Sequence, residues 1–237
     1  MAAGCMAVTG GKAHMPQRFI ARAVTGLTIT QVLLGDSALS RILSQPFTID
    51  PRLPARFGGP ETLQDFGSDS PTGCLGVAEM LHHSVYQSGK VKDVAIEAWR
   101  HAAEYAELTD VKEGVVSLAT PADARALFSR FSQQWQKCDG QDLLLPDPVL
   151  KLRAKISNVQ VAPSVLAGTV SIAFASSGLD AASIPAGRAI GVRDNCLVEV
   201  EVDYFNGSTA SLQGSGVINA TSVGIARIMM DKVSELS

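Results

Sequence analysis

The sequence predicts an α+β fold in which helices pack on one face of an antiparallel sheet. Its second half contains segments that alternate between apolar and polar residues, as strands with one buried face do. Other segments repeat apolar residues at intervals of three and four, which predicts amphipathic helices. The two kinds of element are intermixed without the regular β-α-β order of a parallel sheet.

Length and composition predict one domain. A chain of 237 residues with 46% hydrophobic residues can bury a substantial core without a metal or a dense disulfide network. Its 20 basic and 23 acidic residues give a net charge of −3, and no segment concentrates positive charge. We therefore expect no nucleic-acid partner and no direct binding to a lipid surface. No apolar run reaches the ~18 residues that span a bilayer.

The first residues predict a leader and a candidate lipidation site. Residues 1–16 are rich in small residues and glycine, which indicates a flexible leader before a domain at residues 17–237. The stretch AAGC ending at Cys5 resembles the end of a bacterial lipobox, but Ala2 replaces the usual Leu. The charged and apolar parts of a signal peptide are also absent upstream. Cys5 is thus either a lipidated residue of a truncated precursor or an ordinary thiol.

The next segments predict a short helix and a long loop. Asp36 is placed to cap a helix from Ser37 to Ser44, with three apolar residues on one face. Proline and glycine then interrupt regular structure over residues 46–71. We expect this loop to pack on the domain because it contains many large apolar residues: Phe47, Ile49, Leu53, Phe57, Leu63 and Phe66.

A helix and a strand pair are predicted next. Apolar residues repeat at three and four positions over residues 72–87, which predicts one helix that contains Cys74 and ends at Gly89. The β-branched stretches at residues 91–98 and 111–118 predict an antiparallel pair of strands.

The most complete helix signal begins at Thr120. Thr120 is a good cap, Pro121 suits the first helical position, and Asp123 faces the positive end of the helix dipole. We expect this helix to end at Lys137, before an Asp-Gly pair. Its apolar residues share one face: Ala124, Leu127, Phe128, Phe131 and Trp135.

Strands dominate the rest of the chain. Residues 156–161, 168–175 and 189–204 are predicted strands, the last of them curving near Asp194 and Asn195. Strict alternation over residues 198–203 predicts apolar side chains inward and acids outward. Asn206 and Gly207 predict a turn before a final helix at residues 217–236. Its buried face is expected to contain Ile218, Ile225, Ile228, Met229 and Val233.

Motifs of catalysis are absent from the sequence. His82 and His83 are adjacent, so on a helix they face ~100° apart and cannot share a metal; surface positions are expected for both. No zinc-protease motif, nucleophile elbow, Walker A motif or dinucleotide fingerprint occurs. Glu199 and Glu201 resemble a glycosidase pair, but the alternation predicts the solvent face of a strand. We expect no enzyme activity, no cofactor and no metal.

Four separate residue patterns support a family resemblance. Residues 73–77 read GCLGV, residues 85–89 read VYQSG, residues 121–125 read PADAR and residues 134–138 read QWQKC. In this order they resemble the PknH-like extracellular sensor domain, a mycobacterial family that also occurs in small lipoproteins. The resemblance covers most of residues 36–236. It implies a twisted antiparallel sheet with helices and a cleft for an undefined ligand.

The cysteines are interpreted through that resemblance. No pair has C-x-x-C spacing, and the sequence alone leaves three complete pairings or a reduced state open. The resemblance implies a disulfide between Cys74 and Cys138, and therefore an oxidising compartment. The partner that the family pattern suggests for Cys196 is missing from residues 139–165. Cys196 is either a buried free thiol or the partner of Cys5.

The expected function is non-catalytic binding at the cell envelope. The leading hypothesis is a lipid-anchored extracytoplasmic sensor-type domain that binds a small molecule or an envelope polymer in its cleft. Tyr86, Trp99, Arg100 and Arg193 are candidate ligand contacts because aromatic and arginine side chains bind sugars and anions, although Trp99 also suits a core. The alternative is a module that docks on another envelope protein through a flat apolar patch. A hydrolase would need convergent acid and base groups, which the sequence does not indicate.

Overall fold

A computed structural model describes residues 22–64, 73–104, 106–146, 150–175, 183–205, 208 and 213–237. The strands form one antiparallel sheet of nine strands in the order β1-β3-β4-β9-β8-β7-β6-β5, with β2 also paired to β3. This confirms the predicted fold class. The predicted leader with Cys5, the apolar Phe66 and the turn at residues 206–207 lie outside the described residues.

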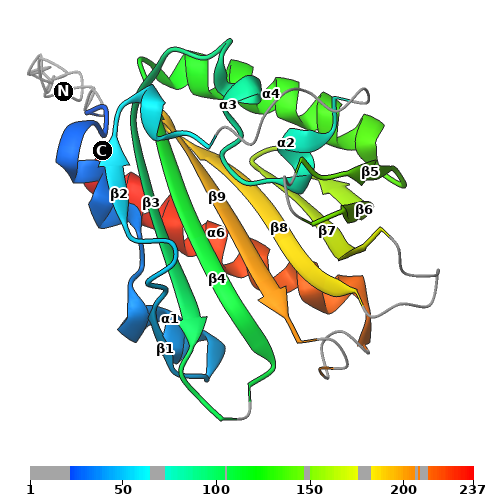
Figure 1. The fold of residues 1–237 in the computed structure, drawn as a ribbon. Helices are drawn as coiled ribbons and strands as arrows, with labels where there is room; N and C mark the ends of the chain where they lie inside the picture. The colour runs from blue at the N-terminus through cyan, green and yellow to red at the C-terminus, as the bar shows by residue number, and fades with distance from the viewer. Residues whose placement is uncertain are drawn as a thin grey trace, which may run out of the picture.

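Six long strands form the body of the sheet and fan out with a pronounced twist (Figure 1). They are β3 (Val91–His101), β4 (Leu108–Leu118), β6 (Leu152–Val161), β7 (Val165–Phe174), β8 (Ile184–Arg193) and β9 (Cys196–Tyr204). Short strands complete the two edges: β1 (Phe47–Ile49) and β2 (Arg56–Gly58) pair with β3, and β5 (Asp142–Leu144) pairs with β6.

Helices cover both faces of the sheet, so the expectation of helices on one face is wrong (Figure 1). One face is covered by α6 (Ser215–Leu236), with η1 (Gly26–Val32) and α1 (Asp36–Leu43). The other face is covered by α2 (Leu75–Ala78), α3 (His83–Tyr86) and α4 (Pro121–Cys138), with η2 (Pro60–Thr62) nearby. Consequently both sets of side chains on a central strand are buried.

The helix at Thr120 forms as its sequence predicts. Thr120 Oγ1 accepts a hydrogen bond of 3.1 Å from the backbone N–H of Asp123, and Pro121 occupies the first turn. The predicted apolar face is buried from Ala124 to Trp135. Burial of a large apolar side chain contributes ~1.5–3 kcal/mol, so this face holds α4 firmly against the sheet.

The predicted helix at residues 72–87 is broken into α2 and α3. Glu79 is extended after α2, and Leu81 has a left-handed backbone with φ 53°. This segment bonds elsewhere: Gln64 N–H donates to the Leu81 carbonyl at 2.9 Å, and His83 N–H donates to the Gln64 carbonyl at 2.7 Å. Long-range pairing with Gln64 thus overrides the local helical pattern, and residues 79–82 cross the sheet instead.

The predicted strand at residues 189–204 is a hairpin of β8 and β9. Asp194 turns the chain with φ 48°, and the side chain of Asn195 is fully buried beside it. Asn195 Nδ2 donates to the carbonyls of Val24 and Leu118 at 2.9 and 3.0 Å, and its Oδ1 accepts from Val24 N–H at 2.9 Å. Asn195 therefore closes the turn and ties the start of the described chain to it.

Smaller differences concern caps and exposure. The helix near Asp36 forms, but its cap is Gly35, and the Asp36 side chain bonds to the adjacent Ser37. In α6, Ile228 is 37% exposed and Met230 is buried instead.

The loop after residue 46 contains β1 and β2, and its apolar residues divide into two groups. Phe47 and Leu63 are buried, whereas Ile49, Leu53 and Phe57 are more than 40% exposed along the sheet edge.

None of the helices in the described part of the chain has the length and apolar character that a membrane crossing requires.

Candidate functional site: a cavity above a charged sheet

A disulfide holds the layer that covers the site. Cys74 and Cys138 are bonded, as the family resemblance implied, and join the start of α2 to the end of α4 across 64 residues. Gln134 in α4 adds a hydrogen bond of 2.6 Å to the Gly73 carbonyl. Closing a loop of this length stabilises a fold by about 4 kcal/mol in the chain-entropy account.

Cys196 has no disulfide partner among the described residues. It is fully buried at the start of β9, and burial raises the pKa of its thiol to about 12. The described residues therefore agree with a buried free thiol. A pairing with Cys5 stays untested because Cys5 lies outside them.

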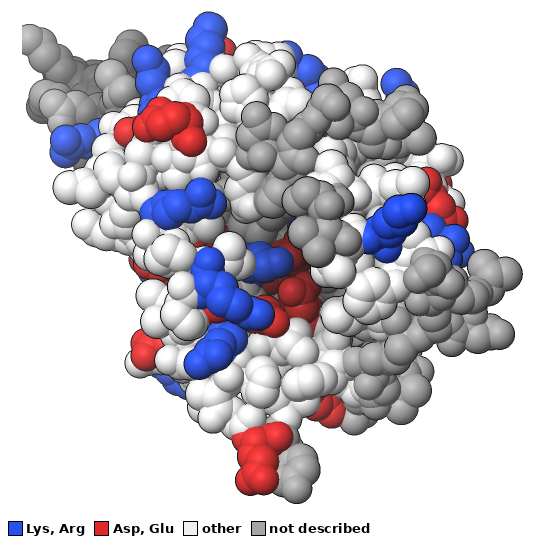
Figure 2. Space-filling model, viewed as in Figure 1, with Lys and Arg blue, Asp and Glu red and all other residues white. Residues whose placement is uncertain are grey.

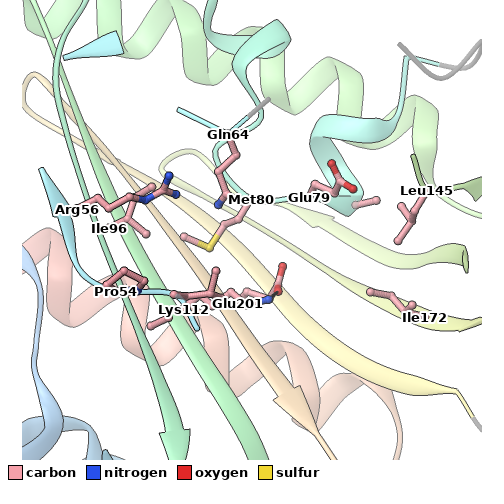
Figure 3. Close-up of a pocket in the computed structure, with 13 residues that line it drawn as sticks. Pro54, Arg56, Gln64, Glu79, Met80, Ile96, Lys112, Leu145, Ile172 and Glu201 are labelled. Atoms are coloured by element: carbon pink, nitrogen blue, oxygen red, sulfur yellow. Dashed lines mark hydrogen bonds and ion pairs between the residues drawn. The ribbon is translucent and has the colours of Figure 1, made fainter. Parts of the chain in front are cut away.

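A cavity of about 250 Å³ lies between the sheet and the segment that follows α2. Figure 3 shows Lys112 and Glu201 on its floor, Gln64, Glu79 and Met80 above them, and Leu145 and Ile172 at one side. On the surface, Figure 2 shows a hollow with acidic side chains at its bottom and basic side chains along one rim. The complete lining is Leu53, Pro54, Arg56, Gln64, Ala78, Glu79, Met80, Ile96, Ala98, Lys112, Leu145, Ile172 and Glu201.

Strand register brings the charges of the floor together. Glu201 of β9 is paired with Lys112 of β4 on one side and with Arg188 of β8 on the other. Lys112 Nζ forms a short ion pair with Glu201 and lies 3.7 Å from Asp203 Oδ2. Arg188 lies 3.5 Å from Glu201 and 2.7 Å from Glu199. We call Lys112, Arg188, Glu199, Glu201 and Asp203 the charged cluster.

The covering segment is bonded directly to the charged cluster. Tyr86 donates its hydroxyl proton to Glu199 Oε1 at 2.5 Å, and Leu81 N–H donates to Glu199 Oε2 at 3.2 Å. Arg188 Nη1 donates to the Val77 carbonyl at 3.1 Å. The break between α2 and α3 is what allows these bonds, so the helix that sequence reasoning predicted would not form this site.

Burial and mutual repulsion alter the acidity of the site. Burial raises the pKa of Glu79 to about 7, with Arg188 opposing the shift and Glu201 adding to it. Burial also raises the pKa of Asp203 to about 7, against the attraction of Lys112. For Glu201 burial acts in the same direction, but Lys112 and Arg188 outweigh it and lower the pKa. The site therefore has carboxyl groups that titrate near neutral pH beside one that stays ionised.

The expectation that Glu199 and Glu201 face solvent is wrong. They are 1% and 8% exposed because α2 and α3 cover the face that was taken as outward. His82, also expected on the surface, is 1% exposed and precedes α3. One sequence signal could have indicated the cluster: Arg188 is a basic residue within the otherwise apolar residues 184–192 of β8, the strand beside β9.

The four predicted ligand contacts do not line this cavity. Tyr86 is buried in the hydrogen bond to Glu199, and Trp99 is packed in the core on the α6 side of the sheet. Arg100 and Arg193 are exposed near the ends of β3 and β8. The structure does not bring the four together, and ligand binding by any of them stays a prediction. The described residues also include no group of three or more side chains suited to a metal ion.

The fold and the cavity define a class: an α+β domain whose antiparallel sheet, covered on both faces, encloses a small polar-floored cavity. The model of the PknH-like extracellular domain family matches residues 24–232. The chain therefore belongs to the PknH-like extracellular domain family. This membership fits an extracytoplasmic, non-catalytic domain of the sensor type.

One known structure agrees with the family assignment at the level of the fold. The extracellular domain of PknH from Mycobacterium tuberculosis aligns with a TM-score of 0.66 and 17% identity, over 91% of this chain and 99% of that one. A hypothetical protein from Helicobacter pylori aligns with a TM-score of 0.29 and 12% identity, over 54% of this chain and 86% of that one, which supports no conclusion. No curated protein matches the sequence significantly.

Proposed function

We propose that this chain is a non-catalytic sensor-type domain that binds a small molecule in the cavity above the charged cluster. The observation behind the proposal is the cavity itself, about 250 Å³ with mainly apolar walls and five polar or charged lining residues: Arg56, Gln64, Glu79, Lys112 and Glu201. This combination is typical of ligand sites, and the volume, slightly below the usual ~300–1,000 Å³, suits a small ligand.

Binding accounts for the charged cluster better than catalysis does. Titrating groups near neutral pH do mark many catalytic sites, but structural ion networks produce them as well. Here Lys112 and Arg188 each contact two carboxylates, and Arg188 is completely buried. Both cations are therefore engaged in ion pairs, and the bonds of the cluster to Tyr86 and Leu81 give it a structural role, which supports binding rather than catalysis.

We further propose that the domain works at the cell envelope, with Cys5 as a lipid anchor. The support is the family membership and the AAGC stretch before the domain. Mass spectrometry of the protein from its native host tests this: an acylated Cys5 peptide supports the anchor, and an unmodified Cys5 thiol contradicts it.

Fragment binding followed by NMR tests the ligand site. We expect several small fragments to shift signals of residues around the cavity. Ala98→Phe places a ring in the cavity from β3 and should abolish these shifts, whereas Ala102→Phe, at an exposed position just beyond β3, should preserve them. A screen in which no fragment shifts a cavity residue of the folded wild-type protein contradicts the proposal.

A second candidate function is docking on another envelope protein. It is favoured by a shallow groove of about 620 Å³ between α1 and α6, where Ile42 and Val217 are 40% and 39% exposed. If this groove is a docking surface, Ile42→Asp should abolish association with the partner while fragments still bind the cavity. Association that survives Ile42→Asp and Val217→Asp contradicts docking through the groove.

A further inference from the structure

The charges around the cavity favour a ligand of one sign. Four carboxyl groups belong to the part of the cavity that lies over the charged cluster, which we call its buried end. Glu79 and Glu201 line the cavity, and Asp203 and Glu199 are paired with Lys112 and Arg188 of the cluster. In the described part of the chain, two basic groups are paired with these acids: Lys112 and Arg188. Burial is the main reason that the pKa values of Glu79 and Asp203 are raised, and repulsion from Glu201 adds to both shifts. Where these carboxyl groups are ionised, above about pH 7 for Glu79 and Asp203, the acids outnumber the two cations and the buried end carries an excess of negative charge.

The two basic groups are already paired with protein acceptors; Arg188 Nε has no hydrogen-bond partner among the described residues, but Arg188 does not line the cavity. Lys112 contacts Glu201 and Asp203, and Arg188 contacts Glu199, Glu201 and the Val77 carbonyl. An anionic ligand would have to displace these contacts within a buried layer, which leaves charges uncompensated and costs several kcal/mol. We therefore do not expect an anionic ligand to bind at the buried end of the cavity.

One carboxylate oxygen of Glu79 can still accept a hydrogen bond. Its side chain is only 15% exposed at the cavity wall, and its Oε2 is buried without a hydrogen bond from any described residue; His82 Nε2 lies 4.0 Å away. A buried carboxylate that lacks a donor is costly, and a cationic donor relieves this cost most effectively. Glu79 is thus the group that a ligand would satisfy.

The rest of the cavity suits an apolar body. Leu53, Pro54, Met80, Ile96 and Ile172 form its walls, with further small apolar residues between them. The basic residue Arg56 also lines it, but this side chain is exposed and lies away from Glu79 in Figure 3. Water and salt screen an exposed charge far more than a buried one, so Arg56 opposes a buried cation only weakly.

We infer that the cavity binds a small organic cation: an amine whose ammonium group bonds to Glu79 above the charged cluster and whose apolar body lies against the aliphatic walls. This inference rests on the proposed ligand site and specifies the chemistry of its ligand. The ammonium donates to the Glu79 carboxylate and balances the acid excess beneath it.

A cation at this position would couple binding to pH. Glu79 faces Arg188, Glu201, Lys112 and His82, and without a ligand its pKa is about 7. An adjacent ammonium lowers that pKa, so binding releases a proton near neutrality. Affinity should then rise as the pH rises from 6 to 8, by at most tenfold per pH unit, because a protonated Glu79 cannot pair with the ammonium. The amine itself stays protonated over this range.

Three probes of equal length test the inference by calorimetry and NMR: hexylammonium, hexanol and hexanoate. On the full chain at pH 8 we expect hexylammonium to bind about tenfold more tightly than hexanol, and hexanoate to bind most weakly. Glu79→Gln preserves the shape of the side chain and should remove the preference for hexylammonium and its pH dependence. The control Glu235→Gln, an exposed acid on α6, should keep both.

The outcomes separate this inference from the proposed site. If hexanol or hexanoate shifts the cavity residues as strongly as hexylammonium, the site stands and the cation inference is wrong. If hexylammonium prefers the wild type but Glu79→Gln binds it equally well, the inference is also wrong. If no probe or fragment affects the cavity residues, both are wrong. Thermal unfolding of each variant confirms that a lost preference comes from the removed charge.

Discussion

The two faces of β9 are built from the same alternating sequence but have opposite chemistry. On the α6 side, Val198, Val200 and Val202 pack against an apolar helix in a dry core. On the other side, Glu199 and Glu201 are equally buried but are held in the charged cluster. Alternation along a strand thus shows which side chains share a face, whereas burial depends on what covers that face.

The largest expected effect is on the charged face. Arg188→Met removes the cation that contacts Glu199 and Glu201 and leaves buried carboxylates uncompensated. We expect a loss of about 4 kcal/mol in the free energy of unfolding, measured by urea denaturation. Adding Glu199→Gln to this variant should recover part of the loss. An Arg188→Met protein as stable as the wild type would show that the cluster contributes nothing to holding the two layers together.

A matched change on the apolar face should cost somewhat less. Met229 of α6 is completely buried, and Met229→Ala should cost about 3 kcal/mol through lost burial and a cavity. This loss should stay constant between pH 6 and 8, because the core around Met229 is apolar. A strongly pH-dependent cost for Met229→Ala would contradict the distinction between the two faces.

Asn195 lies in the turn between β8 and β9 and joins Val24 to Leu118 through its hydrogen bonds. Asn195→Ala removes its bonds to Val24 and Leu118 and leaves three backbone groups without this partner. We expect a cost of about 2 kcal/mol. Hydrogen exchange should also show faster opening of residues 24–34 than of α4. Equal protection of both segments in the variant would mean that Asn195 does not hold the start of the chain.

The smallest effect concerns an exception on the apolar face, Glu113. It is fully buried, and burial raises its pKa to about 7, although Leu34 N–H donates to it at 3.2 Å. Because its folded pKa is raised, the native state holds an extra proton between about pH 4.5 and 7, and stability falls as the pH rises through this range. Glu113→Gln should therefore stabilise the protein by about 1 kcal/mol more at pH 7 than at pH 6 in denaturation experiments. Glu235→Gln, which is exposed, should show no such difference.

The sequence correctly predicted the elements that are stabilised by interactions between residues close together in the chain. The helix from Pro121 is capped by Thr120 as the sequence indicates, and residues 91–98 and 111–118 pair as predicted, although both strands extend further. These signals depend on neighbours within a few positions. The break at Glu79 could not be predicted in this way, because it depends on pairing between Leu81 and Gln64.

Most of the site could not be predicted from the sequence either, because it depends on contacts between residues that are far apart in the chain. Tyr86 was chosen as a ligand contact by its chemistry, but it serves as a hydrogen-bond donor to Glu199. Glu201 was assigned to solvent, but it lies on the cavity floor. Residue type indicates what a side chain can bind, whereas strand register and the covering helices decide which side chains meet. The family resemblance supplied the disulfide and the cleft that the residues alone did not.

The turn at Asp194 and Asn195 has a consequence for how the domain can be attached. Asn195 holds Val24, and Ser237 Oγ donates to Asp194 Oδ2 at 3.2 Å, so both ends of the described chain meet at one corner of the sheet. Segments added at either end would leave from that corner. A short linker between the two ends, with new termini opened elsewhere on the surface, should therefore give a circular permutant with the same sheet.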